Sequence, residues 1–432
     1  MIRRLTLLVA LALFACASTP PAPPWNPLPT AAFSKPLSLA DCLALGQRAD
    51  LRVSAWQARR AAASASLRSA AALPDPTLAL EWEGLGLLGH RADLVGKATL
   101  GAPLFVWWSR PHAIRGARAE ACAAAEAIRE ERRKLAAEIA SAWFELVADQ
   151  RRERISGEVV SLTQEALRWA TAHRDAGTRS PFDVLRAEAD ALQARSDLDE
   201  ARARRRQDQL AFAFALGADR PALPEALEPL VGGAGFANQI GDLPEAVIAA
   251  ALGGDPAWAQ ARAKVSAAEE ALHVQQTSVP PLGGGSGSLG RTGPSGGKTG
   301  FASLDLPIPF FGGSKAQRDQ ALAALDAARA EEERVRRETV LSLAQAWERV
   351  RAAEARWTQV ARPLSEKLSE VARRASALYR AGEIDYGEAL QADREHRTAE
   401  RTEIDAWRDA RVARFTLETS TGLHDDLVST DR

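Results

Sequence analysis

The sequence is poor in the residues that build most catalytic and metal sites. Among its 432 residues only three are cysteine, six are histidine, two are tyrosine and one is methionine. Cys16, Cys42 and Cys122 are too few for a disulfide framework, and they form no CxxC pair for zinc. The histidines are scattered, and no nucleophile or acid pair stands out. We therefore expect no enzyme activity, no metal and no cofactor.

The chain also lacks an excess of one charge. It has 55 basic and 56 acidic residues, so a basic surface for nucleic acid has no support. An apolar run of eleven residues, 5–15, follows Arg3 and Arg4. Because a bilayer core needs about 20 residues, this run is too short to span it and is typical of an export signal. We assign 1–15 to a signal peptide.

The end of this run, LFAC at 13–16, resembles the bacterial lipobox. The resemblance implies cleavage before Cys16, acylation of that residue and a lipid-anchored mature chain. It also favours the outer membrane, because Ala17 rather than an aspartate follows the cysteine. The alternative is an ordinary signal peptide with an incidental cysteine. The next stretch is rich in proline, so we assign 16–37 to a lipidated, extended tether.

Two copies of one pattern fill the rest of the chain. A shift of 204 residues aligns Trp143 with Trp347, and after one extra residue a shift of 205 aligns Gly177 with Gly382. Two ordered runs of matches whose offsets differ by one residue are not expected by chance. We therefore expect a tandem duplication, with repeat 1 at 38–230 and repeat 2 at 231–432.

Each repeat predicts a leading helix, a very long helix and a second helix. In the long helix of repeat 1, Leu135, Ile139, Ala142 and Leu146 have the 4, 3, 4 spacing of a coiled-coil seam. An Ala-Gly pair separates the long and second helices of each repeat, as expected at the tip of an antiparallel hairpin. The expected helices are 39–71, 115–172 and 181–216, then 243–276, 315–380 and 386–421.

Two extended segments separate the leading and long helices of each repeat. Residues 74–84 alternate apolar and polar side chains, and 96–108 return to end in Trp107 and Trp108. In repeat 2 the second segment ends in Phe310 and Phe311, whereas the first is glycine-rich and hardly predicts a strand. Four strands are too few for the smallest membrane barrels, which have about eight. Either several chains close one barrel, or these strands lie outside a membrane.

This order of features resembles the outer membrane efflux protein family, the TolC-like outer membrane factors. The lipobox and the first strand segment resemble the lipoprotein members that serve resistance-nodulation-division pumps. The resemblance implies a mainly α fold with a small β part. Long antiparallel helical hairpins would form a periplasmic α-barrel, and each chain would give four strands to a transmembrane β-barrel shared by a homotrimer.

The implied function is that of a passive conduit in the outer membrane, with a large periplasmic part. It would export small solutes, either drugs or heavy-metal cations, that an inner-membrane pump delivers through a periplasmic adaptor. Two alternatives stay open: a lipid-tethered periplasmic coiled-coil protein, and an exit duct for type I protein secretion. The recurrence of strand pairs at matched positions in both repeats disfavours the coiled-coil alternative.

The resemblance also implies roles for individual residues. Glu388 takes the place of an acid that lines the family's pore constriction, and Gln391 stands where a second acid is missing. Three Glu388 carboxylates around one axis would favour cations; alternatively, Glu388 is an exposed first-turn acid that suits the helix dipole. The remaining expected constriction residues are Asp183 and Asp385. The expected adaptor contacts are Ala176, Gly177, Thr178, Arg179, Ala381, Gly382 and Glu383. The aromatic pairs at 107–108 and 310–311 are either a membrane-interface belt or core.

Overall fold

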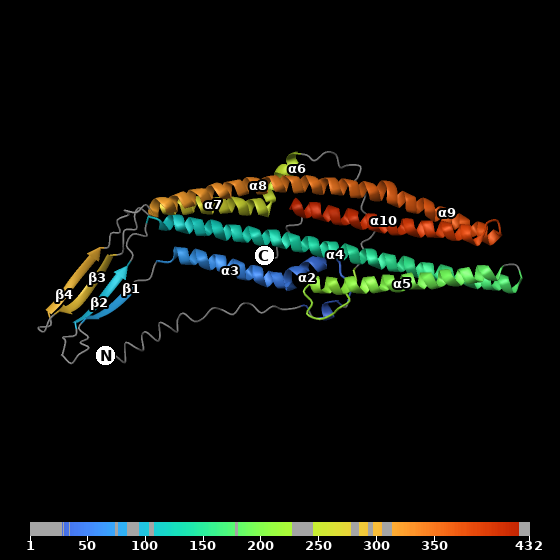
Figure 1. Cartoon of the computed structure of the whole chain (residues 1–432), viewed down its shortest axis with the longest axis horizontal. Helices are drawn as coiled ribbons and strands as arrows, with labels where there is room; N and C mark the ends of the chain where they lie inside the picture. The colour runs from blue at the N-terminus through green and yellow to red at the C-terminus, as the bar shows by residue number, and fades with distance from the viewer. Residues whose placement is uncertain are drawn as a thin grey trace.

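The computed structural model describes residues 28, 30–33, 35–73, 77–83, 95–102, 108–177, 180–226, 245–277, 285–292, 297–304 and 313–422. The chain is elongated, with a small sheet at one end and the tips of two helical hairpins at the other (Figure 1). Among the described helices, none combines the length and apolar character needed to cross a membrane.

The elements occur in the same order in both repeats. Repeat 1 contains α2 (Leu39–Ala49), α3 (Leu51–Ala71), β1 (Thr77–Glu83), β2 (Val95–Ala102), α4 (Arg110–Asp175) and α5 (Pro181–Ala215). Repeat 2 contains α6 (Glu245–Gly254), α7 (Pro256–Thr277), β3 (Gly285–Thr292), β4 (Gly297–Leu304), α8 (Gly313–Ala355), η3 (Arg356–Ala361), α9 (Arg362–Ala381) and α10 (Tyr386–Ser420). The order of elements predicted from the sequence is thereby confirmed.

The leading helix of each repeat is split in two, which differs from the single helices expected. Asp50 has an extended backbone, with φ −63° and ψ 134°, and its side chain accepts the N–H of Arg52 at 2.7 Å. Asp255 accepts the N–H of Trp258 at 2.7 Å in the same way. An aspartate that caps a new helix in this manner ends the preceding one, so each leading segment breaks at its aspartate.

The second long helix is also interrupted, at the π-helical turn η3. The N–H of Arg362 bonds to the carbonyl of Trp357, five residues earlier. Pro363 follows, and proline has no N–H to donate and clashes with the preceding turn. A π turn absorbs such a defect without ending the helix, which explains why α8 and α9 continue one another with a bend (Figure 1).

Glycines end the long helices as the sequence predicts. Gly177 and Gly382 have φ of 72° and 81°, in the left-handed region that side chains disfavour. At the second tip the N–H of Glu383 bonds to the carbonyl of Leu378 at 3.0 Å, which completes a Schellman cap. Each long helix therefore turns back sharply into its partner.

The four strands form one antiparallel sheet in the order β1-β2-β3-β4. Leu80 pairs with Ala98, and Leu100 pairs with Gly287, so the sheet crosses from repeat 1 to repeat 2 between β2 and β3. The glycine-rich segment that hardly predicted a strand is β3, paired on both sides. The hydrogen-bonded ladders to β2 and β4 compensate for the low strand propensity of its glycines.

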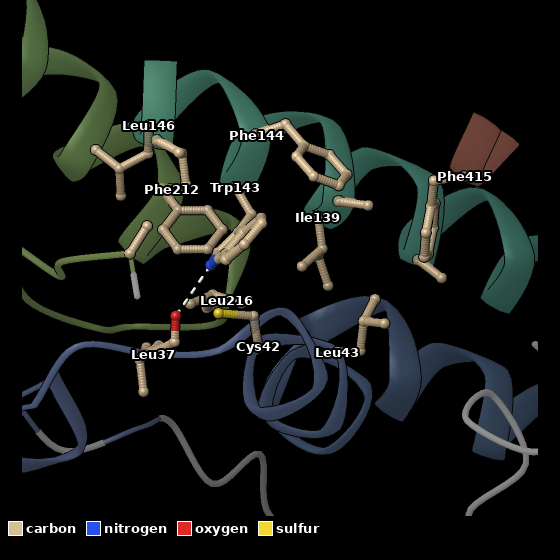
Figure 2. Packing of buried hydrophobic residues seen from close by; sticks show 14 of the residues in the cluster. Leu37, Cys42, Leu43, Ile139, Trp143, Phe144, Leu146, Phe212, Leu216 and Phe415 are labelled. Carbon is tan, nitrogen blue, oxygen red and sulfur yellow. Dashed lines mark hydrogen bonds between the residues drawn. The ribbon is translucent and has the colours of Figure 1, made fainter. Parts of the chain in front are cut away.

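The main core surrounds α4 and includes residues of α2, α3, α5, η3 and α10. Ile139, Trp143 and Leu146 of α4 pack with Leu43 and Phe212, and all five are buried (Figure 2). Nε1–H of Trp143 donates to the carbonyl of Leu37 at 3.0 Å. The described part of the expected tether therefore lies against the helices.

Candidate functional site: the hairpin tips

The tips of the two hairpins are held together by an aromatic cluster. Tyr386 at the start of α10 is buried with Ala170 of α4 and Val184 of α5. The ring of Tyr379 lies 5.7 Å from that of Tyr386 and 4.7 Å from that of Trp169. The two repeats therefore share a small core of their own near the tips.

A polar contact joins the same helices beside this cluster. Asp190 of α5 accepts a hydrogen bond from Nη2 of Arg394 at 2.7 Å and a longer one, 3.4 Å, from the hydroxyl of Tyr386. Burial raises the pKa of Tyr386, and the charge of Asp190 raises it further, so its hydroxyl stays protonated and can donate. We call Asp190, Tyr386 and Arg394 the tip link. It connects repeat 1 to repeat 2.

The expected constriction residues occupy different environments. Asp385 caps α10 by accepting the N–H of Glu388 at 2.8 Å, so one of its oxygens already has a structural role. Glu388 and Gln391 are exposed, and both line a hollow of about 500 Å³ together with Asp385. Asp183 is half-buried in the first turn of α5 and does not line this hollow.

A basic side chain that the sequence reasoning missed lies at the same hollow. Arg186 of α5 is among its lining residues. A Cβ placed on Gly387 would lie 3.1 Å from Oδ1 of Asp385 and 3.5 Å from Nη1 of Arg186, so these charges are neighbours. The hollow thus holds acids and a guanidinium rather than acids alone.

The structure describes only some of the residues predicted for the adaptor contact and the membrane interface. Ala176, Gly177, Ala381, Gly382 and Glu383 are exposed at the two turns. Trp108 precedes α4 and is 62% exposed. The other expected residues lie outside the described part of the chain: Cys16, Trp107, Thr178, Arg179, Phe310 and Phe311.

A sequence signal could have identified one member of the tip link, Tyr386, in advance. The chain has two tyrosines, Tyr379 and Tyr386, and they flank the second turn. Asp190 and Arg394 carry no comparable signal, because nothing in the sequence pairs them. Across the described residues, no group of three or more histidine, cysteine, aspartate and glutamate side chains is arranged to hold a metal ion.

Comparison with known proteins places this architecture in a family. A model of the family described as outer membrane efflux protein matches residues 42–218 and 247–423. The second match begins 205 residues after the first, which equals the offset between the tip glycines. A search of curated protein sequences finds no match.

Solved structures with the same fold are known from several bacteria. The outer membrane protein VceC of Vibrio cholerae is 17% identical, with a TM-score of 0.72 over 89% of this chain and 96% of that one. A membrane protein of Pseudomonas aeruginosa is 19% identical, with a TM-score of 0.70 over 94% and 98%. The MtrE outer membrane channel of Neisseria gonorrhoeae is 18% identical, with a TM-score of 0.68 over 89% and 88%. With both halves of the chain matched by the family model, the protein belongs to the outer membrane efflux protein family and has the TolC-like fold.

Proposed function

We propose that three copies of this chain form the outer membrane channel of a tripartite efflux system. The trimer is a passive conduit for small solutes, drugs or heavy-metal cations. An inner-membrane pump, of the resistance-nodulation-division type, delivers them through a periplasmic adaptor. The observation that carries this proposal is the four-stranded sheet with β1 and β4 at its edges.

The sheet supports assembly because its edges need partners. Backbone groups on an open edge have no partner in lipid, so a membrane sheet must close on itself. Four strands cannot close, since the smallest membrane barrels have about eight. Three copies of the sheet β1-β2-β3-β4 would supply a ring large enough, with β4 of one copy beside β1 of the next.

The helices carry a matching pair of faces. On α5, Phe182, Leu185 and Leu192 are 68%, 62% and 70% exposed, at a spacing that aligns them on one face. In repeat 2, Leu364, Val371 and Leu378 of α9 are exposed at seven-residue intervals. Spacings of this kind are typical of coiled-coil seams. Two different apolar faces on one chain favour head-to-tail association, which closes into a ring.

The arrangement of helices leaves these two faces available. α5 packs on α4, α4 packs on α10, and α10 packs on α9. This order puts α5 and α9 on opposite sides of the four-helix layer (Figure 1). We propose that α5 of one copy packs on α9 of its neighbour, so that the hairpins form a continuous periplasmic wall.

The tips are the proposed pore constriction and adaptor contact. Exposed Glu388 and Gln391 at the hollow are suited to face a lumen. The guanidinium of Arg186 reduces the net negative charge there, so we propose moderate rather than strong cation preference. The exposed turns at 176–177 and 381–383 are the proposed adaptor contacts.

We also propose that Cys16 is acylated and anchors the chain. We propose further that Trp107, Trp108, Phe310 and Phe311 mark the membrane interface. Trp108 supports this role because it is exposed between β2 and α4. Mass spectrometry of the mature N-terminus, beside a Cys16→Ser variant, tests the anchor. An unmodified wild-type cysteine would contradict it.

Gel migration and bilayer recording together test the channel. Unboiled outer-membrane fractions should contain a trimer-sized band that boiling converts to the monomer, and the reconstituted trimer should conduct ions. A Leu185→Glu variant should weaken the trimer by placing a charge in the apolar seam. Glu188→Gln, also on α5 and exposed, is the matched control. A monomer-only band from unboiled wild type would exclude the proposal.

A further inference from the structure

The four-stranded sheet has two chemically different faces. Residues directly opposite each other in an antiparallel pair lie on the same face, and successive residues along a strand lie on opposite faces. The register therefore assigns each strand residue to one of two faces. One face carries Leu78, Leu80, Leu100 and Leu289, and the other carries Glu81, Lys97, Thr99 and Ser288. In membrane barrels the apolar face of such a sheet is the one toward lipid.

Two basic residues lie on the apolar face. Arg291 of β3 is directly opposite Lys298 of β4. Leu289 belongs to the apolar face and precedes Arg291 by two positions, so Arg291 lies on the same face. Lys298 shares that face because it is opposite Arg291. A basic residue on the lipid side of a barrel is unfavourable except near the membrane interface, so this pair is expected at the level of the head groups.

A tryptophan lies in the same row of the sheet. Trp82 of β1 is opposite Gly96 of β2. Lys97 of β2 is opposite Gly290 of β3. The next positions toward the same end of the sheet, Gly96 and Arg291, are therefore level with each other. Tryptophan is enriched where head groups meet the apolar layer, so the composition of this row is typical of a membrane interface.

This row lies at the end of the sheet that is far from the helices. β1 and β3 follow α3 and α7, and β2 and β4 precede α4 and α8. The helices therefore join the sheet at one end, and Arg291 and Lys298 lie near the other (Figure 1). Lys298 precedes Phe310, a proposed marker of the membrane interface near the helices, by twelve residues. A strand needs about 9–11 residues to cross a membrane, so this row is at the level of the outer leaflet.

The pairing of Arg291 with Lys298 brings two positive charges together. Residues directly opposite in an antiparallel pair have Cβ atoms about 4.5–5.5 Å apart, and like charges at this spacing destabilise the sheet. Glu81 and Lys97, the other two charged residues that pair in the described sheet, have opposite signs. The pair of bases therefore lacks the compensation that the polar face has.

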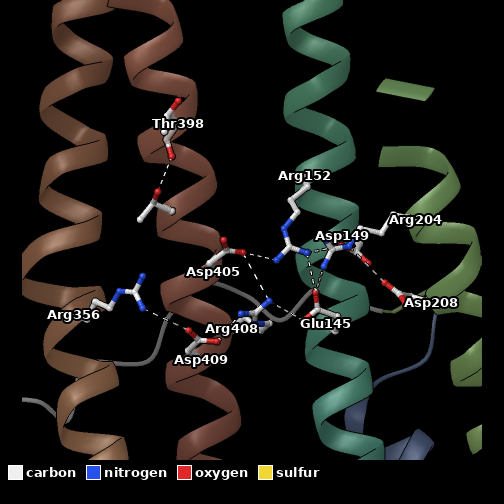
Figure 3. Close-up of polar contacts among 11 residues, drawn as sticks. Glu145, Asp149, Arg152, Arg204, Asp208, Arg356, Thr398, Asp405, Arg408 and Asp409 are labelled. Carbon is white, nitrogen blue, oxygen red and sulfur yellow. Dashed lines mark hydrogen bonds and ion pairs between the residues drawn. The ribbon is translucent and has the colours of Figure 1, made fainter. Parts of the chain in front are cut away.

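Charges that meet between the helices also have opposite signs. Midway along the hairpins, Arg152 of α4 and Arg408 of α10 both donate hydrogen bonds to Glu145 of α4, each at 2.9 Å (Figure 3). Arg152 also bonds to Asp405 of α10. In the sheet, by contrast, the residue opposite Arg291 is a second base. A negative charge from outside the chain would relieve this repulsion.

We propose that Arg291 and Lys298 bind a phosphate group of a phosphorylated lipid in the outer leaflet. This inference rests on the proposed function, because it requires the sheet to lie in the outer membrane. A phosphate accepts two parallel hydrogen bonds from a guanidinium, and an ammonium supplies a further donor. One phosphate therefore offsets the repulsion between the two bases, while the acyl chains of the lipid lie against the apolar rows that begin at Leu289.

The bound lipid lies beside the contact between copies. β4, which carries Lys298, is an edge strand of the sheet and is adjacent to β1 of the next copy in the proposed ring. Each trimer has three such sites. Lipid binding should therefore raise the temperature at which the trimer dissociates.

Native mass spectrometry of the purified trimer with added lipid tests the site. The two probes are lipid A with both phosphates and the same lipid after enzymatic removal of its phosphates. Wild type should bind the phosphorylated probe at least about tenfold more tightly, because charge-assisted hydrogen bonds are lost with the phosphates. The double variant Arg291→Gln/Lys298→Gln should lose this preference. Lys97→Gln, the matched control on the polar face, should follow wild type.

A second variant separates lipid binding from the stability of the sheet. Lys298→Glu replaces two like charges with an opposite pair, so its lipid-free trimer should dissociate at a higher temperature than wild type. Phosphorylated lipid A should raise this temperature in wild type and leave it unchanged in Lys298→Glu. An equal rise in both, or wild-type binding that does not distinguish the two probes, would overturn the proposal. Loss of the preference on adding an equal concentration of inorganic phosphate would also overturn it, because the site would then bind a free anion.

Ion current from the same preparations distinguishes this proposal from the proposed function. A wild-type trimer that conducts but lacks the lipid preference would exclude the lipid site alone. A wild type with neither trimer nor current would exclude the channel, and with it the membrane position on which the lipid site depends.

Discussion

We propose that the tip link holds the hairpin tips of the channel in a closed arrangement, so weakening it should shift them toward an open one. Asp190 is 12% exposed and takes the hydrogen bond from Arg394 at 2.7 Å, which ties α5 to α10. In Asp190→Asn the side chain keeps its size but loses the charge that attracts the guanidinium. The two hairpins are then held at the tips mainly by the aromatic cluster around Tyr386.

The free energy that the bond between Asp190 and Arg394 contributes depends on how exposed the two side chains are. A hydrogen bond between charged groups contributes about 1.5–3 kcal/mol when buried. Arg394 is 58% exposed, so solvent screening reduces this to about 1 kcal/mol per copy. The 3.4 Å contact to Tyr386 is too long to add much. About 1 kcal/mol corresponds to a roughly fivefold shift between closed and open tips.

Single-channel recording in planar bilayers measures this shift as open probability. Arg394→Gln should match Asp190→Asn, and the double variant should be no more open than either single one, because both remove the same bond. Asp199→Asn, exposed and paired within α5, should behave as wild type. Unchanged traces in both single variants, or additive effects in the double, would refute this role of the tip link.

Three other substitutions, one of them with a matched control, test other parts of the structure. Glu388→Ala should lower the cation preference of the pore without closing it, and an unaltered reversal potential in a salt gradient would argue against a luminal position. Trp143→Phe should cost about 2–3 kcal/mol in urea unfolding, because the buried carbonyl of Leu37 loses its donor; a loss below about 0.5 kcal/mol would contradict that. Gly217→Ala should cost about 2–4 kcal/mol, since φ is 93° and the new Cβ would lie 2.5 Å from the carbonyl oxygen of Ala49. Gly253→Ala is the matched control: a Cβ there meets nothing within 4 Å, so this variant should not lower the free energy of unfolding.

The sequence predicts the repeat architecture well because its signals are local. Gly177 and Gly382 each end a breaker-free, coiled-coil-like segment, and a left-handed turn is what glycine permits there. The offset of 204–205 residues adds independent support, because each predicted element appears twice. Such signals do not depend on distant contacts.

The features that were missed depend on context. Asp50 and Asp255 occupy equivalent positions in the two repeats, and each splits a leading helix by capping the next one, yet aspartate also occurs inside helices. Pro363 is absorbed by a π turn instead of ending its helix. β3 becomes a strand because β2 and β4 pair with it, which no local pattern of glycine and serine indicates.

The tip link illustrates a further limit. Asp190 and Arg394 are 204 residues apart, about one repeat, so they meet because the duplicated hairpins pack side by side. Charged residues are abundant on these helices, and no sequence spacing distinguishes this pair from the others. The same holds for Arg186, whose proximity to Asp385 changes the charge expected at the hollow.

The central claim is that one copy cannot close its own sheet, because β1 and β4 remain edges. Native mass spectrometry of the protein released from lipid, with current recorded from the same preparation, tests it most directly. We predict a mass of three chains and a steady ion current. A single-chain mass with no current would contradict the account.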